Sequence, residues 1–167
     1  RFLLHISDDR DDMVEVHRRL VDSAALDGFV IVEPRVNDPR IAFLRKRKIP
    51  FVVHGRTAPE VDYPFFEIDN FAVGYRLTQH LAGLGHRRIA IVGAPGHSAP
   101  IRDRLAGAKA TLAAAGVVPV AERIGGVHSF EACRDLVLDL LDSGAHPTAI
   151  LCTTDIAAIG AIHACVQ

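Results

Sequence analysis

Residues 85–93 read GHRRIAIVG and join the predicted end of a helix to a predicted strand. Before them, apolar residues recur at spacings of three and four over residues 73–84, which predicts a helix capped by Asp69 or Asn70. Gly85 is expected to end this helix because glycine readily adopts a left-handed backbone conformation. The histidine and two arginines that follow suit the negative end of the helix dipole, and the apolar run after them predicts a strand.

The same alternation of predicted helices and strands extends in both directions from this stretch. Further strands are predicted at residues 2–6, 28–32, 51–53, within 117–124 and at 149–152, with a short extended passage at 65–68. Helices between them are expected to begin near Asp11 or Asp12, Asp38, Ile101, Ser129 and residues 153–155. Residues 28–32 are apolar throughout, as in a strand covered on both faces of its sheet.

This alternation predicts an α/β protein with two lobes, each a parallel sheet flanked by helices. The boundary between the lobes is expected around residues 66–69. Two such lobes form a cleft at the carboxyl ends of their strands, which is the usual ligand position in open α/β sheets.

Composition sets limits on function. The chain has 167 residues, is 49% apolar and carries a formal net charge of −1, so these residues alone are not expected to hold DNA strongly. No apolar run approaches the length of a membrane span, and residues 1–12 do not resemble a secretory signal. Three cysteines lie in apolar patterns without a CxxC pair, so we expect buried, reduced thiols: Cys133, Cys152 and Cys165.

Other features are better explained without a special function. The basic run at residues 45–48 ends a short predicted helix, where cations complement the dipole and stay solvated. The histidines show no paired metal spacing, and residues 93–96 lack a nucleotide-binding glycine pattern. We therefore expect no metal and no cofactor.

Several short motifs, in this order and spacing, resemble the LacI/GalR family of bacterial transcription regulators. They are Asp27-Gly28, Ile49-Pro50, Asp69-Asn70, Gly74, His80-Leu81, GHRRIA at 85–90, RLAG at 104–107, PTAI at 147–150 and TDIAAIG at 154–160. The resemblance covers nearly the whole chain.

The resemblance implies a periplasmic-binding-protein-like core that senses an effector. It assigns residues 1–67 to part of the N-terminal lobe and residues 68–167 to most of the C-terminal lobe. The DNA-binding headpiece of the family has no counterpart here, nor do the first strand and helix of the core. We therefore expect this chain to be a fragment of a longer regulator. The implied partners are a sugar effector, with a purine or nucleoside as the alternative, operator DNA through the headpiece, and a second copy in a cytoplasmic homodimer.

Arg104 corresponds to the family's effector-contacting arginine. Its planar guanidinium can hold two adjacent sugar oxygens in a fork. The alternative is a surface arginine in the first turn of a helix, where its charge would oppose the dipole, and this poor placement favours the ligand role. For Arg102, a contact with the ligand and a simple surface position are equal alternatives.

Asp155 and Thr154 stand where a strand ends and a helix begins. Capping and dipole compensation explain both, and the resemblance adds a contact in the cleft. His128 falls where family members place an aromatic ring that stacks on the effector, but an exposed loop histidine is an equal alternative. Phe71 either forms a platform for the ligand or packs between the lobes.

The remaining candidates flank the cleft. Asp69 and Asn70 combine capping with a position at the crossover. Arg56 follows a strand, and Gly55 replaces the acidic residue that often precedes it in the family, which puts the identity of the sugar in doubt. Glu33, at another strand end, could supply a carboxylate instead or could simply be solvated.

Two rival functions remain open. A sugar-binding protein of a transporter has the same fold and cleft, but the GHRRIA motif and the unpaired cysteines favour the regulator. An enzyme on a doubly wound sheet lacks support, because the sequence shows no nucleophile elbow, metal cluster or phosphate loop.

Overall fold

A computed structural model describes residue 4 and residues 12–23, 26–58, 60–93, 99–125 and 129–166. The chain divides into two compact units, residues 1–68 and residues 69–167, each an α/β unit with a parallel three-stranded sheet. Within the described ranges, no helix combines the length and apolar character needed to cross a membrane.

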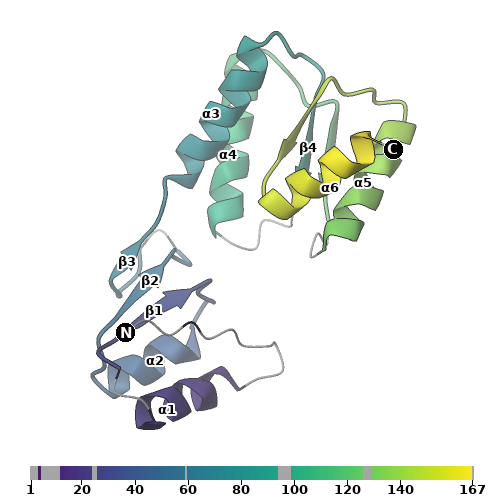
Figure 1. Cartoon of the computed structure of the whole chain (residues 1–167). Coiled ribbons are helices and arrows are strands. Elements are labelled where there is room, and N and C mark those ends of the chain that lie inside the picture. The colour runs from purple at the N-terminus through teal and green to yellow at the C-terminus, as the bar shows by residue number, and fades with distance from the viewer. Residues whose placement is uncertain are drawn as a thin grey trace. The chain divides into compact units, whose positions relative to one another are not determined.

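The first unit contains a sheet of order β1-β2-β3 with two helices (Figure 1). Its elements are α1 (Met13–Ser23), β1 (Phe29–Val32), α2 (Pro39–Lys46), β2 (Phe51–His54) and β3 (Phe65–Phe66). As predicted, Asp12 and Asp38 accept hydrogen bonds from the first backbone N–H groups of α1 and α2. The core joins strands β1 and β2 to α2 through four buried side chains: Ile31, Ile41, Leu44 and Val53.

One prediction for this unit is wrong. Strand β1 is covered on one face only, because Val30 and Val32 are about half exposed while Ile31 is buried. The apolar run was therefore a poor guide to burial on both faces. Of the strand predicted at residues 2–6, only Leu4 is described, and it is exposed and belongs to no strand; the other four residues lie outside the described residues.

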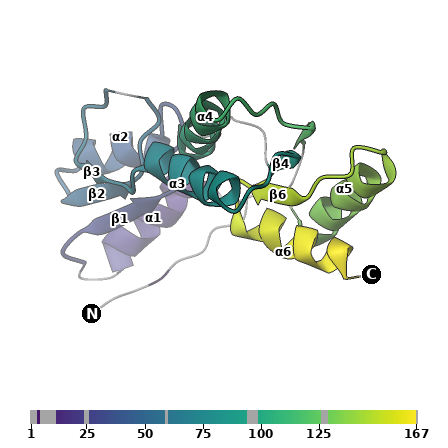
Figure 2. The same cartoon turned by 90° about the horizontal axis from the view of Figure 1, so that it is seen from above.

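The second unit is a sheet of order β5-β4-β6 between two pairs of helices. Its elements are α3 (Asn70–Gly83), β4 (Ile89–Gly93), α4 (Ala99–Ala114), β5 (Ala121–Ile124), α5 (Phe130–Asp142), β6 (Ala149–Cys152) and α6 (Asp155–Cys165). Figure 2 shows α3 and α4 on one side of β4 and β6, with α5 and α6 on the other. All of β4 is buried, as expected of the central strand.

Successive residues of β4 serve opposite cores. Ile89 and Ile91 pack towards α4, where Leu112 is buried, whereas Ala90 and Val92 pack against α5 and α6. This period-two alternation fixes the register of the central strand.

The opening motif connects α3 to the sheet. Gly85 has φ +90°, as predicted, and Arg87 donates a hydrogen bond to the carbonyl of Ala82 near the end of α3 (3.0 Å). Arg88 donates to the carbonyl of Ala145 (2.8 Å), and its own carbonyl accepts from the backbone N–H of Thr148 (2.7 Å). The motif therefore ties α3 to the loop before β6.

The cysteine prediction is partly wrong. All three thiols are free, and Cys133 is buried, but Cys152 is half-buried and Cys165 is exposed. Burial, and then the neighbouring Cys133 and Cys165, raise the pKa of Cys152 to about 11.

Candidate functional site

Arg104 connects two other polar groups of the second unit. Its Nε donates a hydrogen bond to Oδ1 of Asn70 (2.8 Å), and its Nη1 donates to the carbonyl oxygen of Thr153 (2.7 Å). These contacts bring together the start of α3, the helix α4 and the turn after β6. The predicted residues Arg104 and Asn70 are therefore in direct contact.

The two helix starts beside Arg104 are well formed. Asp69 caps α3, since its Oδ1 accepts from the backbone N–H of Ala72 (2.9 Å). Thr154 caps α6, since its Oγ1 accepts from the backbone N–H of Ala157 (3.3 Å). Capping thus accounts for part of the role predicted for both residues.

The expected position of Arg104 within its helix is wrong. Helix α4 begins at Ala99, so Arg104 is in its second turn and not at the N-terminus. The charge of Arg104 therefore lies beyond the region where it would oppose the helix dipole, because that effect falls off within the first turn. The ligand role depends instead on the hydrogen bonds that orient the guanidinium.

The guanidinium keeps capacity for further partners. An arginine side chain has five N–H donors, and Asn70 and Thr153 use two of them. Within the second unit, the described residues make no other hydrogen bond to it. The three remaining N–H groups, on Nη1 and Nη2, can serve a ligand with adjacent oxygens.

Thr153 is a residue that sequence reasoning missed as part of the site. It is 4% exposed, and its Oγ1 has no hydrogen-bond partner among the described residues. Gly93 makes room for it, because a Cβ on Gly93 would overlap with this hydroxyl. The available signal is its position directly after a strand, which the helix-starting run of Thr153, Thr154 and Asp155 also explains.

The other candidates of the second unit are more exposed. The Asp155 carboxylate accepts from the backbone N–H of Ile156 (2.9 Å) at the start of α6. Phe71 is exposed and stacks on Tyr75, with ring centroids 6.5 Å apart. His128 lies outside the described residues.

In the first unit, Arg56 lies just beyond β2, as predicted. Its Nε donates to Oε1 of Glu67 at 2.5 Å, and both side chains are largely buried, with exposed fractions of 30% and 16%. Glu67 was not predicted as a partner, because the contact joins residues that are distant in sequence. Glu33 is exposed after β1 and adopts a positive φ of 52°.

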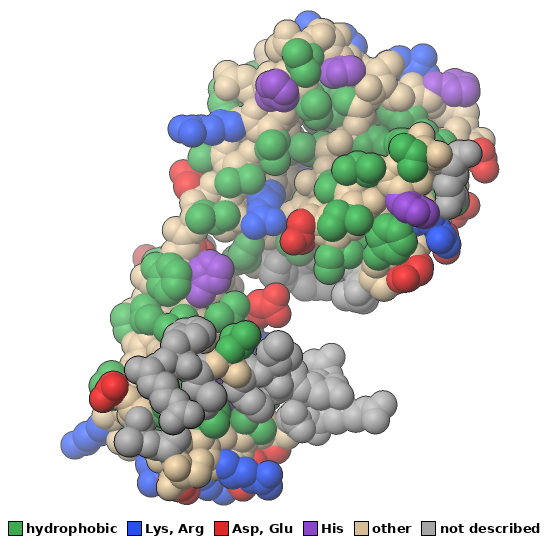
Figure 3. All heavy atoms as spheres, in the orientation of Figure 1, with side chains coloured by type: hydrophobic (Ala, Val, Ile, Leu, Met, Phe, Trp, Pro, Cys, Tyr) green, Lys and Arg blue, Asp and Glu red, His purple; other side chains and the backbone are tan. Residues whose placement is uncertain are grey.

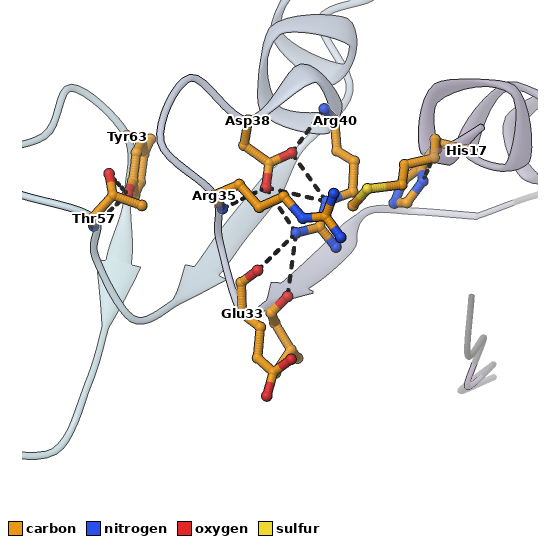
Figure 4. A network of polar contacts seen from close by, with 9 residues as sticks. His17, Glu33, Arg35, Asp38, Arg40, Thr57 and Tyr63 are labelled. Atoms are coloured by element: carbon orange, nitrogen blue, oxygen red, sulfur yellow. Dashed lines mark hydrogen bonds and ion pairs between the residues drawn. The ribbon is translucent and has the colours of Figure 1, made fainter. Parts of the chain in front are cut away.

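A buried polar network holds the loop that contains Glu33 (Figure 4). The Asp38 carboxylate accepts from the backbone N–H of Arg35 (3.0 Å) and from the guanidinium of Arg40 (2.7 Å), and Arg40 also donates to the carbonyl of Glu33 (3.1 Å). Burial raises the pKa of Asp38, but these hydrogen bonds outweigh it and hold that pKa below its ordinary value. In Figure 4 the Glu33 carboxylate points away from this network.

Two further observations limit the chemistry. The described residues contain no cluster of histidine, cysteine or carboxylate side chains that could hold a metal ion. An apolar groove of about 620 Å³ runs along β6 between α3 and α6, and its walls include Leu77, Ile150 and Ile162 but none of the predicted site residues.

A parallel α/β fold in two units, with oriented polar groups at the carboxyl ends of strands, defines a protein of the periplasmic-binding-protein class. The whole chain, residues 1–167, matches the family described as periplasmic binding proteins and sugar binding domain of LacI family. The chain belongs to this family.

Relatives agree with this assignment. The chain is 35% identical over 161 residues to the HTH-type transcriptional regulator AglR of Rhizobium meliloti, covering 92% of this chain and 44% of AglR. It is 31% identical to the regulator RafR of Escherichia coli, covering 97% of this chain and 48% of RafR. The chain therefore spans about half the length of the curated relatives it matches.

Solved structures show the same fold. A regulatory protein of the LacI family from Chloroflexus aggregans superposes with a TM-score of 0.81 at 38% identity, over 96% of this chain and 58% of that one. The transcriptional regulator CelR in complex with cellobiose superposes with a TM-score of 0.76 at 26% identity, over 93% of this chain and 49% of that one.

Proposed function

We propose that this chain is the effector-binding core of a DNA-binding transcription regulator and that Arg104 contacts a neutral, hydroxyl-rich effector. The observation that carries the proposal is the guanidinium fixed by Asn70 and Thr153 with three N–H groups left over. The cellobiose complex of the related regulator CelR supports a sugar as the effector class. A purine or nucleoside is the alternative ligand.

The proposed mechanism is ligand-linked switching between two arrangements of the lobes. Residues 1–67 form part of the N-terminal lobe and residues 68–167 most of the C-terminal lobe. An effector that binds one arrangement better shifts the population towards it, which alters operator affinity through a DNA-binding headpiece. Coupling of about 1–3 kcal/mol is the usual scale for such linkage.

The two rival functions have less support. The named relatives AglR and RafR are transcriptional regulators, which favours a regulator acting in the cytoplasm over a transporter's binding protein or an enzyme. Turnover of a sugar or nucleotide by the purified protein would support the hypothesis that it is an enzyme.

A homodimer is part of the proposal. Helix α6 carries exposed isoleucines at 156, 159 and 162, although its other face is already buried in the core. Figure 3 shows hydrophobic side chains gathered on the surface of the second unit. A helix that is apolar all round is normally covered, and a second copy is the proposed partner. We expect Ile159→Asp to convert a dimer to a monomer in sedimentation, and a wild-type monomer would contradict this part of the proposal.

Thermal-shift screening of the full-length protein tests the ligand site. The panel contains glucose, galactose, maltose, cellobiose and adenosine, and a true ligand raises the melting temperature by mass action. We expect Arg104→Ala to abolish the shift while the protein stays folded. Arg76→Ala, which removes an exposed arginine of the neighbouring helix α3, is the matched control and should keep it. If the ligand raised the melting temperature of Arg104→Ala as much as that of the wild type, Arg104 would be excluded as a ligand contact.

A further inference from the structure

Asn70 has a role that helix capping does not explain. Asp69 already caps α3, so the first residue of the helix has no need of a polar side chain. Asn70 is nevertheless 5% exposed, and its Oδ1 accepts from Nε of Arg104 at 2.8 Å. A buried amide is retained where it makes specific hydrogen bonds, and this one is aimed at the arginine of the proposed site.

We infer that Asn70 is a positioning residue, which orients the Arg104 guanidinium for the effector and does not itself need to touch the effector. Its effect on binding rests on the proposed function. The Nε bond to Asn70 and the Nη1 bond to the Thr153 carbonyl hold two corners of one planar group. Together they set the plane and direction in which the remaining N–H groups point.

The choice of an amide has an electrostatic consequence. An asparagine oxygen accepts the Nε hydrogen without carrying a charge, whereas an aspartate would form an ion pair with the guanidinium. The Thr153 carbonyl is likewise uncharged. Arg104 is thus held in place while its positive charge stays available to ligand oxygens, which strengthens hydrogen bonds to them.

The contact can be measured without a ligand by NMR of the Arg104 Nε–H group in the full-length protein, assigned by its loss in Arg104→Lys. We expect Asn70→Ala and Asn70→Ser to speed exchange of this hydrogen with water at least tenfold, because the acceptor is lost. Asn70→Asp keeps an acceptor and should keep the protection. Thr111→Val is the matched control, since it removes a buried hydroxyl that links α4 to the Tyr75 carbonyl of α3.

Unchanged exchange in both Asn70→Ala and Asn70→Ser would overturn the inference. Faster exchange in Thr111→Val to the same degree would also overturn it, because loosening of α3 against α4 would then suffice. Asn70→Ser keeps the measurement possible if the alanine variant does not fold, because serine is well tolerated at a helix start.

Binding then tests the consequence for the site. For the panel compound that shifts the melting temperature most, we expect Asn70→Ala to weaken binding about tenfold, because the arginine must be ordered at the moment of binding. In an Arg104→Lys background the same change should have no effect, since lysine has no Nε–H for Asn70 to hold. An equal loss in both backgrounds would mean that Asn70 acts directly on the ligand. If no compound binds but exchange responds as expected, the positioning stands and the proposed sugar effector fails.

Discussion

Gly74 of α3 lies against the backbone carbonyl of Arg104 in α4, so closely that a Cβ on Gly74 would overlap with that oxygen. Gly107 of α4 lies in the same way against the carbonyl of Phe71 in α3. The two helices therefore touch backbone to backbone at these two positions. This close approach requires glycine for lack of space, and not for its backbone freedom.

Gly74→Ala should accordingly be strongly destabilising. The methyl group has no free space, and only a shift of the whole helix can make room, so we expect a loss of about 3 kcal/mol in the free energy of unfolding. Urea denaturation measures it. Gly83→Ala in the same helix is the control: nothing lies within 4 Å of its Cβ, so it should be neutral or stabilising by up to about 1 kcal/mol. Equal effects of the two variants would contradict the close contact.

Asp38 should make stability depend on acidic pH. Its folded pKa lies below the ordinary value of 3.8, so its contribution is fully present above that value and is lost as the pH falls through the folded pKa. Asp38→Asn should flatten the stability profile below about pH 4. At pH 7 it should cost about 2 kcal/mol, because Arg40 loses its charged partner but keeps the carbonyls of Val32 and Glu33.

Unfolding by urea between pH 2.5 and 7 measures this difference. Asp62→Asn is the matched control, because Asp62 pairs with Arg45 in an exposed ion pair that should contribute little. A profile for Asp38→Asn that runs parallel to that of the wild type would exclude Asp38 as the source.

Thr154 offers a test of capping. Thr154→Ala removes the hydroxyl that accepts from Ala157 and should lower the free energy of unfolding by about 1 kcal/mol, whereas Thr154→Ser should retain it. Chemical denaturation distinguishes the variants. If serine proved as harmful as alanine, loss of the threonine methyl and not of the cap would be responsible.

The thiols should differ in reactivity. Cys165 is exposed, so we expect one fast-reacting thiol per chain with a disulfide reagent at pH 8, absent in Cys165→Ser. Cys133 is buried and the pKa of Cys152 is raised to about 11, so both should react only after unfolding. A second fast thiol in the native protein would show that Cys152 is more accessible than its environment implies.

Local patterns predicted the elements well, because their causes lie within a few residues. Capping by Asp38 and the turn at Gly85 depend on adjacent backbone groups, and both are confirmed. Whether a face is covered depends on distant elements, which is why Val30 and Val32 differed from expectation. The α/β class and the family were predicted and are confirmed.

The site was predicted less completely for the same reason. Arg104 and Asn70 are separated by 34 residues, and Arg104 and Thr153 by 49, so no spacing rule connects them. The resemblance supplied Arg104, but the backbone carbonyl of Thr153 has no signature in a sequence. The ligand-binding roles of the candidate residues stay predictions.

The paired glycines also bear on how the second unit can move. No layer of side chains separates α3 from α4 at Gly74 and Gly107, so neither helix can slide past the other by changing rotamers. The pair must rotate or translate as one rigid body, carrying Asn70 and Arg104 with it. We therefore expect a displacement of the first turn of α3 to carry the guanidinium with it.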